Sequence, residues 1–205
     1  MNTINIITIN MRNSFDNANE AYEELLDEVV INGMDFDNTK ALFNCGFYIR
    51  DPQNNHITNE QRNWSLNYAE AEWQWYLSGD PSIHKLGELY GKIPPIWKRK
   101  AQIDYVCAKL KTNKKTRHAA ISIYDGKEYD KYKTDTPCTY AIQFTIVDDQ
   151  LCMSVYMRSN DIWYGFCNDQ YQFSSLQKMI ARRLNLEIGW YYHHAHNMHL
   201  YNDKL

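Results

Sequence analysis

The chain has no long hydrophobic run and no recognisable targeting segment. No window approaches the ~18 consecutive apolar residues that a membrane-spanning helix needs. Residues 1–12 include isoleucines, but no cationic start is followed by a long apolar core, so we expect no signal peptide. The sequence therefore predicts a protein without a membrane partner.

Paired cysteines are also lacking. The five cysteines are odd in number and widely spaced, with no Cys-x-x-Cys pair: Cys45, Cys107, Cys138, Cys152 and Cys167. This spacing suits neither a disulfide framework nor a zinc site. We therefore expect a reducing cytoplasm, which is the host cytoplasm if the protein is viral.

Charge of one sign is not in excess. The formal net charge is -3, and the basic run at residues 111–117 is offset by acidic residues elsewhere. A nucleic-acid-binding protein would usually carry a basic face, so no nucleic-acid partner is expected. An enzyme that handles a small anion is compatible with this balance.

What the chain does contain is typical of one globular domain. Its 205 residues are 44% hydrophobic and 14% aromatic, enough for a sizeable core, and no repeat or linker divides residues 1–205. Apolar residues recur at helical spacing over residues 21–32, 66–77 and 102–111, and again after Gly165. Strands are expected at residues 40–49, 119–124, 140–147, 151–157 and 189–201. Because these elements do not alternate strictly, the expected class is α+β, a mixed sheet packed with helices.

Cys138 differs from the other cysteines in its setting. It opens a predicted strand after a polar loop, where a side chain can face a cleft. Arg158 ends the next hairpin strand, and an arginine near a thiol favours the reactive thiolate. Arg158 with Ser159 also suits a phosphate, through a planar fork and a hydroxyl donor. The ordinary alternatives are a small buried hydrophobe for Cys138 and a surface salt bridge for Arg158.

Four motifs in order resemble the thymidylate synthase family, and they span most of the chain. They are Glu72-x-x-Trp75, Pro137-Cys138 with Gln143, Arg158-Ser159-x-Asp161 with Gly165, and the closing His199-x-Tyr201. The resemblance implies a thymidylate-synthase-like fold. It also implies methylenetetrahydrofolate as co-substrate and a homodimer with shared active sites.

Two positions resemble the phage deoxycytidylate (dCMP) hydroxymethylases more closely. Thymidylate synthases usually carry histidine after the nucleophile and asparagine four residues beyond the glycine, where this chain has Thr139 and Asp169. A carboxylate at the second position accepts from the amino group of cytosine but opposes the carbonyl oxygen of uracil. Such a mismatch costs about 1–3 kcal/mol. The alternative role for Asp169 is a cap on the following helix.

The resemblance implies a covalent mechanism. The Cys138 thiolate adds to carbon 6 of the pyrimidine, and carbon 5 then attacks the one-carbon unit of the folate. Water captures the resulting exocyclic methylene to give 5-hydroxymethyl-dCMP, whereas hydride would give a methyl group. Glu72 is assigned to proton transfers and to ordering water, and Asp169 to the base.

The remaining candidate residues are assigned by the same resemblance. Arg158 and Ser159 bind the phosphate, with help from the partner's Arg117, in Arg117-His118, and from Lys40. His199 and Tyr201 hold the sugar hydroxyl, Asp161 faces the folate pterin, and Asn168 joins the substrate-binding set.

Two departures from the family pattern concern length. The stretch after Asp80 is short, and either Tyr90-Gly91 or Ile96-Trp97 corresponds to the aromatic segment of the family. The chain also stops four residues after Tyr201, without the tail that covers the ligands in relatives. We expect weaker folate binding as a result. The lack of a covering tail should harm hydride transfer more than the capture of water, so it fits hydroxymethylation better than methylation.

Three other interpretations remain open. The substrate is dUMP or CMP in the first, and the product is then methylated or hydroxymethylated. In the second, the chain is a non-catalytic nucleotide-binding relative, although binding alone needs neither Cys138 nor Glu72. In the third, His193, His194, His196 and His199 hold a metal, but no carboxylate or thiolate partner is near in sequence.

Overall fold

The computed structural model describes residues 13–78, 100–127 and 136–205. Its helices are α1 (Ala18–Asn32), α2 (Leu66–Ser78), α3 (Lys100–Thr112) and α4 (Phe166–Leu184). Its strands are β1 (Ser14–Phe15), β2 (Met34–Phe36), β3 (Thr39–Ile49), β4 (Ala120–Ser122), β5 (Thr139–Val147), β6 (Gln150–Met157), β7 (Asn160–Asp161) and β8 (Glu187–Tyr201), and a 3-10 turn, Asn202–Lys204, follows β8. None of the helices in these ranges is long and apolar enough to cross a membrane.

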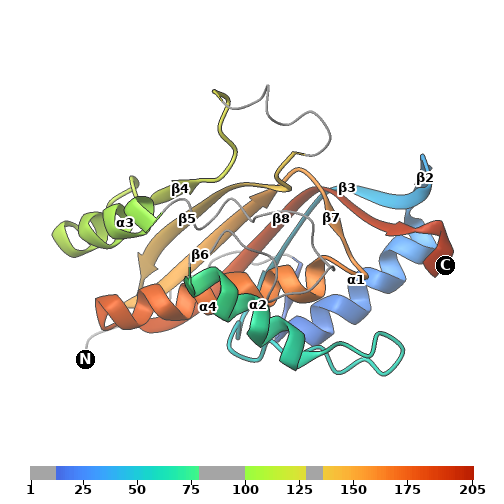
Figure 1. Ribbon diagram of the computed structural model, residues 1–205, viewed down its shortest axis with the longest axis horizontal. Coiled ribbons are helices and arrows are strands. Elements are labelled where there is room, and N and C mark those ends of the chain that lie inside the picture. Colours follow the sequence, from blue (N-terminus) through green and yellow to red (C-terminus); the bar gives the residue numbers. More distant parts are fainter. Residues whose placement is uncertain (1–12, 79–99, 128–135) are drawn as a thin grey trace, which may run out of the picture.

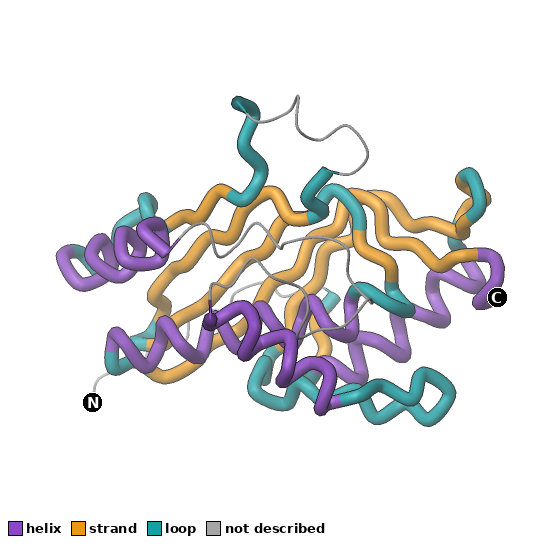
Figure 2. The backbone as a smooth tube through the Cα atoms, in the orientation of Figure 1, coloured by secondary structure: helices purple, strands orange, loops and turns teal. Residues whose placement is uncertain are grey.

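The described strands form one mixed sheet (Figure 2). Its order is β1-β3-β8-β6-β5-β4, with β2 paired to β3 and β7 paired to β8. The long central strand β8 is antiparallel to β3 and parallel to β6. Helices and strands therefore mix without a regular βαβ alternation, which confirms the expected α+β class.

The helices lie mainly on one face of this sheet (Figure 1). Helix α1 contacts β3 and β8, α4 contacts β6 and β8, and α2 packs on α4 as an outer layer. Helix α3 lies at the β4 end. Because side chains alternate along a strand, Tyr191, His193 and Ala195 of β8 all point into the core beneath the helices.

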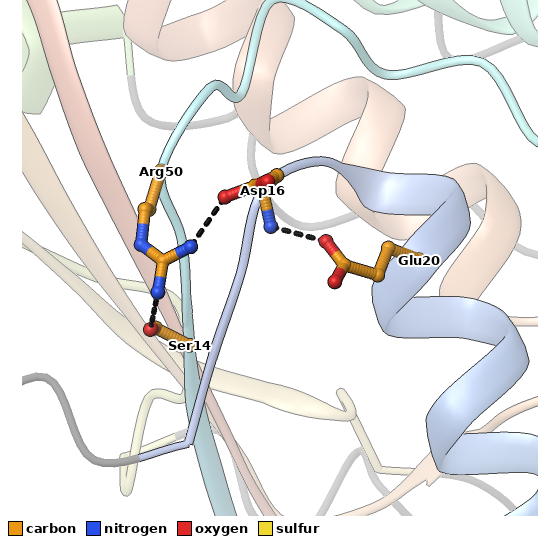
Figure 3. Close-up of polar contacts among 4 residues, drawn as sticks. All are labelled: Ser14, Asp16, Glu20 and Arg50. Carbon is orange, nitrogen blue, oxygen red and sulfur yellow. Dashed lines mark hydrogen bonds and ion pairs between the residues drawn. The ribbon is translucent and has the colours of Figure 1, made fainter.

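Helix α1 shows how local sequence sets an element. Asn17 caps it by accepting a hydrogen bond from the backbone N–H of Glu20 at 3.0 Å. Gly33 ends it, and a Cβ there would lie 2.2 Å from the carbonyl oxygen of Val29, so only glycine fits. Arg50, at the end of β3, donates to Ser14 and Asp16 and joins that strand to the segment entering α1 (Figure 3).

Most elements expected from the sequence are confirmed, and the differences have local causes. The hairpin of β5 and β6 turns at Asp148 and Asp149, whose φ angles of 49° and 59° suit a tight turn. The expected strand at residues 119–124 is shorter, and β1, β2 and β7 were not expected. These three strands have only two or three residues, too few to show an alternating pattern.

Candidate active site

Cys138 lies immediately before β5, and its residue is exposed. The backbone N–H of Arg158 donates to the Cys138 carbonyl oxygen at 2.7 Å. The Arg158 side chain donates from Nη2 to the carbonyl oxygen of Thr136 at 2.6 Å and from Nε to that of Pro137 at 3.3 Å. The structure thus brings the proposed nucleophile and the proposed phosphate-binding arginine together, with the guanidinium holding the segment that precedes the thiol.

The pairing of β7 with β8 gathers a second group beside Arg158. Asp161 is the register partner of His199, and Ser159 Oγ lies 3.4 Å from His199 Nδ1. Burial lowers the pKa of His199, the charge of Asp161 opposes that shift, and the charge of Arg158 adds to it. The imidazole is therefore neutral near pH 7, able to donate from one nitrogen and accept at the other. The Tyr201 ring packs edge-on against His199, with ring centroids 5.3 Å apart.

Asp161 is half-buried and also stabilises the turn that leads to α4. Its Oδ1 accepts from the backbone N–H groups of Trp163, at 2.8 Å, and Tyr164, at 3.2 Å. Burial raises the pKa of Asp161, and these two N–H groups oppose the shift. The carboxylate is therefore fixed in position by its own turn.

Asp169 occupies the first turn of α4. The helix is capped at Gly165 without a side-chain hydrogen bond, so the alternative role of Asp169 as a helix cap is wrong. Asn160 Nδ2 donates to Asp169 Oδ2 at 2.7 Å. Burial, and then the charges of Glu72 and Asp161, raise the pKa of Asp169 to about 7, against the effect of the Asn160 bond. The half-buried carboxyl group therefore changes protonation state near neutral pH.

Glu72 lies on α2 and is only 5% exposed. Gln172 Nε2 donates to its Oε2 at 3.0 Å, and the Tyr76 hydroxyl donates to its Oε1 at 3.4 Å. Burial raises the pKa of Glu72 to about 7 in spite of both donors. A carboxyl group with this pKa can both give and take a proton at physiological pH, as a general acid–base residue must.

Three candidate residues lie apart from this group. Both ends of the Asn168 amide are bonded within the protein: its Oδ1 accepts from Trp64 Nε1 at 2.9 Å, and its Nδ2 donates to the Tyr164 carbonyl oxygen at 3.3 Å. Lys40 pairs with Leu200, one residue out of step with His199, so it points to the opposite face of the sheet. Arg117 is exposed just before β4, at the other edge of the sheet from β3.

The histidines of β8 divide between the two faces of the sheet. His193 is buried, stacks on Phe47 and shares a 2.6 Å hydrogen bond with the Tyr191 hydroxyl, and burial lowers its pKa to about 3. His196 Nδ1 lies 3.1 Å from Asn44 Oδ1 on the other face. Within the described ranges, no three His, Cys, Asp or Glu side chains are placed to hold a metal ion.

The sequence did not single out three residues that shape the site. Gln172 and Tyr76 bond Glu72, and Asn160 bonds Asp169. Tyr76 lies four residues after Glu72, a spacing that a helix brings together, so this contact was accessible to pattern reasoning. Gln172 and Asn160 act across the fold. Asp80, Tyr90-Gly91 and Ile96-Trp97, named from the resemblance, lie outside the described residues.

Comparison with known proteins gives one family. The family model described as thymidylate synthase matches residues 20–205. The chain is 28% identical over 159 residues to a thymidylate synthase of Fusobacterium nucleatum, covering 66% of this chain and 57% of the relative. It is 29% identical over 157 residues to one of Buchnera aphidicola (65% and 59%) and 30% identical over 126 residues to one of Listeria monocytogenes (59% and 40%).

The chain spans about half the length of the curated relatives it matches. The family model nevertheless covers nearly all of it, including every residue of the group built around Cys138, Glu72 and Asp169. The chain therefore belongs to the thymidylate synthase family.

Proposed function

We propose that this chain is one domain that acts in the cytoplasm as a hydroxymethyltransferase of the phage dCMP type. It would convert dCMP to 5-hydroxymethyl-dCMP with methylenetetrahydrofolate as co-substrate. The observation that carries the proposal is Asp169, a half-buried carboxyl group whose pKa is raised to about 7. It stands where thymidylate synthases usually carry asparagine, according to the sequence resemblance.

Asp169 suits cytosine when it is protonated. The Watson–Crick edge of cytosine offers an acceptor at ring nitrogen 3 and a donor at the 4-amino group. A carboxylic acid offers one O–H donor and one acceptor oxygen, which is the complementary set. A pKa of about 7 keeps this acid form populated at neutral pH.

The proposed reaction uses Cys138 as the nucleophile, Glu72 for proton transfer and Asp169 to bind the base. The Cys138 thiolate adds to carbon 6, which places a carbanion at carbon 5. The folate supplies the one-carbon unit that carbon 5 attacks. Loss of the carbon-5 proton and departure of tetrahydrofolate from the one-carbon unit leave an exocyclic methylene. Water adds to that methylene, and expulsion of the thiolate restores the ring. Glu72, with its pKa raised to about 7, relays the protons and orders the water.

The nucleotide would lie along the β7–β8 junction. The charge of Arg158 acts on His199, and Ser159 Oγ lies 3.4 Å from His199 Nδ1, so a phosphate and a sugar hydroxyl could be held by neighbouring side chains. We assign Arg158 and Ser159 to the phosphate, His199 and Tyr201 to the sugar, and Asp161 to the folate pterin. Asn168 and Lys40 are weaker candidates for substrate binding. Asn168 bonds Trp64, and Lys40 lies on the opposite face of the sheet from His199.

We also propose that two copies of the chain form a homodimer. The sheet face opposite α1 and α4 carries aromatic side chains in mutual contact, including Tyr48, Tyr156 and Tyr192. Tyr156 is 40% exposed, and Tyr48 and Tyr192 are half-buried. Pairing two such faces would bury them, and Arg117 from each copy would then serve the phosphate site of the other.

Mixing two inactive variants tests this arrangement. Cys138→Ala and Arg117→Ala should each be inactive or strongly impaired alone. A heterodimer contains one site with an intact Cys138 and a partner-supplied Arg117, so mixing should restore activity. If mixing restores nothing while sedimentation shows that dimers have exchanged, the shared site is wrong.

Release of tritium from carbon 5 tests the activity itself. Labelled dCMP and labelled dUMP are compared with and without methylenetetrahydrofolate, and Cys138→Ala serves as the blank. The proposal requires folate-dependent release from dCMP, absent in the variant, with a hydroxymethyl product. Release from dUMP alone would favour a thymidylate-synthase-like activity. No release from either nucleotide would favour a non-catalytic nucleotide-binding relative.

A further inference from the structure

Asn160 is a buried amide in direct contact with Asp169. It lies on the short strand β7, pairs with Met198 of β8 and is 3% exposed. Its Nδ2 donates to Asp169 Oδ2 at 2.7 Å. A Cβ at Gly165 would lie 2.9 Å from Asn160 Nδ2 and 3.3 Å from Asp169 Oδ2, so the absence of a side chain there leaves room for this contact.

A carboxylic acid alone does not distinguish cytosine from uracil. Cytosine offers an acceptor at nitrogen 3 and a donor at position 4, whereas uracil offers a donor at nitrogen 3 and an acceptor at position 4. An acid has two equivalent oxygens, and its proton can sit on either one. Moving the proton reverses the order of donor and acceptor and so matches either base. An asparagine lacks this freedom because its donor and acceptor are different atoms.

The Asn160 amide removes the equivalence of the two oxygens. The Asn160 N–H is directed at Oδ2, so a proton on that oxygen would compete with the N–H for the same lone pair. The acid proton is therefore favoured on Oδ1. Oδ2 keeps a second lone pair and remains an acceptor toward the ligand. Within the described ranges, Asn160 Oδ1 receives no hydrogen bond. The hydrogen bond from Nδ2 to Asp169 is therefore the polar contact that holds this buried side chain.

We propose that Asn160 is a positioning residue that assigns the proton of Asp169 to one oxygen and thereby sets the preference between dCMP and dUMP. This inference rests on the proposed function, in which Asp169 contacts the base. The fixed donor–acceptor order complements one pyrimidine edge and opposes the other, and in the proposed function the complemented edge is that of cytosine.

The groups around Asp169 make its protonation sensitive to Asn160. Glu72 from α2 and Asp161 from β7 raise the pKa of Asp169, and Cys167 and Tyr191 also interact with it electrostatically. The Asn160 hydrogen bond opposes these influences and lowers the pKa of Asp169. Removing this hydrogen bond should therefore raise the pKa of Asp169 and also let its proton sit on either oxygen.

The test compares the dissociation constants of dCMP and dUMP in three variants and the wild type. Asn160→Leu keeps the side-chain volume without a donor, and Asn160→Ala removes both. Gln170→Ala is the matched control, because Gln170 is a buried amide on the same helix turn as Asp169 that bonds the carbonyl oxygens of Asn55 and Cys167 instead. Thermal unfolding shows that each variant folds.

We expect the wild type and Gln170→Ala to prefer dCMP by about ten- to a hundredfold. Both Asn160 variants should bind the two nucleotides within about threefold of each other, mainly through tighter binding of dUMP. The pH at which dCMP affinity falls on the alkaline side should also move upward in Asn160→Leu, which a merely structural role would not cause.

Two results would overturn the inference, and they differ in whether the proposed function also fails. If the wild type prefers dCMP and the folded Asn160 variants keep the same ratio, Asn160 does not set the preference and the proposed function stands. If the wild type binds both nucleotides equally, the reading of cytosine by Asp169 fails together with the role of Asn160.

Discussion

The charge of Glu72, on α2, acts on the carboxyl group of Asp169, on α4. The charge of Glu72 is the largest influence after burial in raising the pKa of Asp169. Both groups have a pKa of about 7, so close to neutral pH the pair holds an intermediate number of protons. Such a pair can offer a protonated carboxyl group to the base and, in the same enzyme, a carboxylate that accepts a proton during the reaction.

The Glu72→Gln variant tests this coupling through nucleotide binding. Removing the charge of Glu72 removes an influence that raises the pKa of Asp169, so that pKa should fall. Because dCMP binds the protonated form, its affinity should decline at lower pH in the variant than in the wild type. Calorimetric titration of dCMP from pH 6 to 9 measures the shift. Identical pH profiles would show that the two carboxyl groups are not coupled.

Burial of Glu72 should also appear in the stability of the protein. A carboxyl group ionises near pH 4.5 in the unfolded chain but at about 7 in the folded protein, so the folded state binds more protons between these values. The free energy of unfolding therefore falls as pH rises through this window, by at most about 3 kcal/mol. Glu72→Gln should remove this decline and stabilise the protein at pH 8 relative to the wild type.

Urea unfolding at pH 5 and pH 8 measures this effect. The conservative control is Glu70→Gln on the exposed side of α2, which should leave the pH dependence unchanged. A wild-type stability that does not decline from pH 5 to pH 8 relative to Glu72→Gln would mean that Glu72 is ionised when buried.

Cys138 should form a covalent bond to carbon 6 of the base. A dCMP analogue with fluorine at carbon 5 cannot lose a proton there, so the adduct should accumulate when the folate is present. Mass spectrometry of the denatured protein detects it. Cys138→Ala should show no adduct, and the control Cys45→Ala, changed at a half-buried thiol on β3, should retain it. An adduct that persists in Cys138→Ala would assign the nucleophile elsewhere.

The sequence was sufficient for elements whose pattern is local. Helix α1 follows from its apolar spacing and from Gly33, and the β5–β6 hairpin follows from two β-rich runs around Asp148 and Asp149. The α+β class and the family membership also follow from the sequence. These features depend on residues close together in the chain, which is why periodicity and motifs identify them.

The contacts that tune the site could not be predicted in the same way. Helix α4 buries polar residues such as Gln172 and Gln177, which bond Glu72 and the carbonyl oxygens of Leu151 and Gly189. A buried glutamine looks like a surface residue in a sequence pattern, so its partners stay hidden. The Asn160–Asp169 bond likewise depends on how β7 lies beside the first turn of α4, and no spacing rule encodes that placement.

The measurement that tests the central claim most directly is the base preference of Asp169→Asn. Asparagine at this position fixes a donor and an acceptor in an order that Asp169 does not impose by itself. Folate-dependent tritium release from carbon 5 should favour dCMP in the wild type and shift toward dUMP in the variant, with a change in the kcat/KM ratio of about a hundredfold or more. A wild type that prefers dUMP, or a folded variant with an unchanged preference for dCMP, would contradict the assignment of Asp169 as the residue that reads the base.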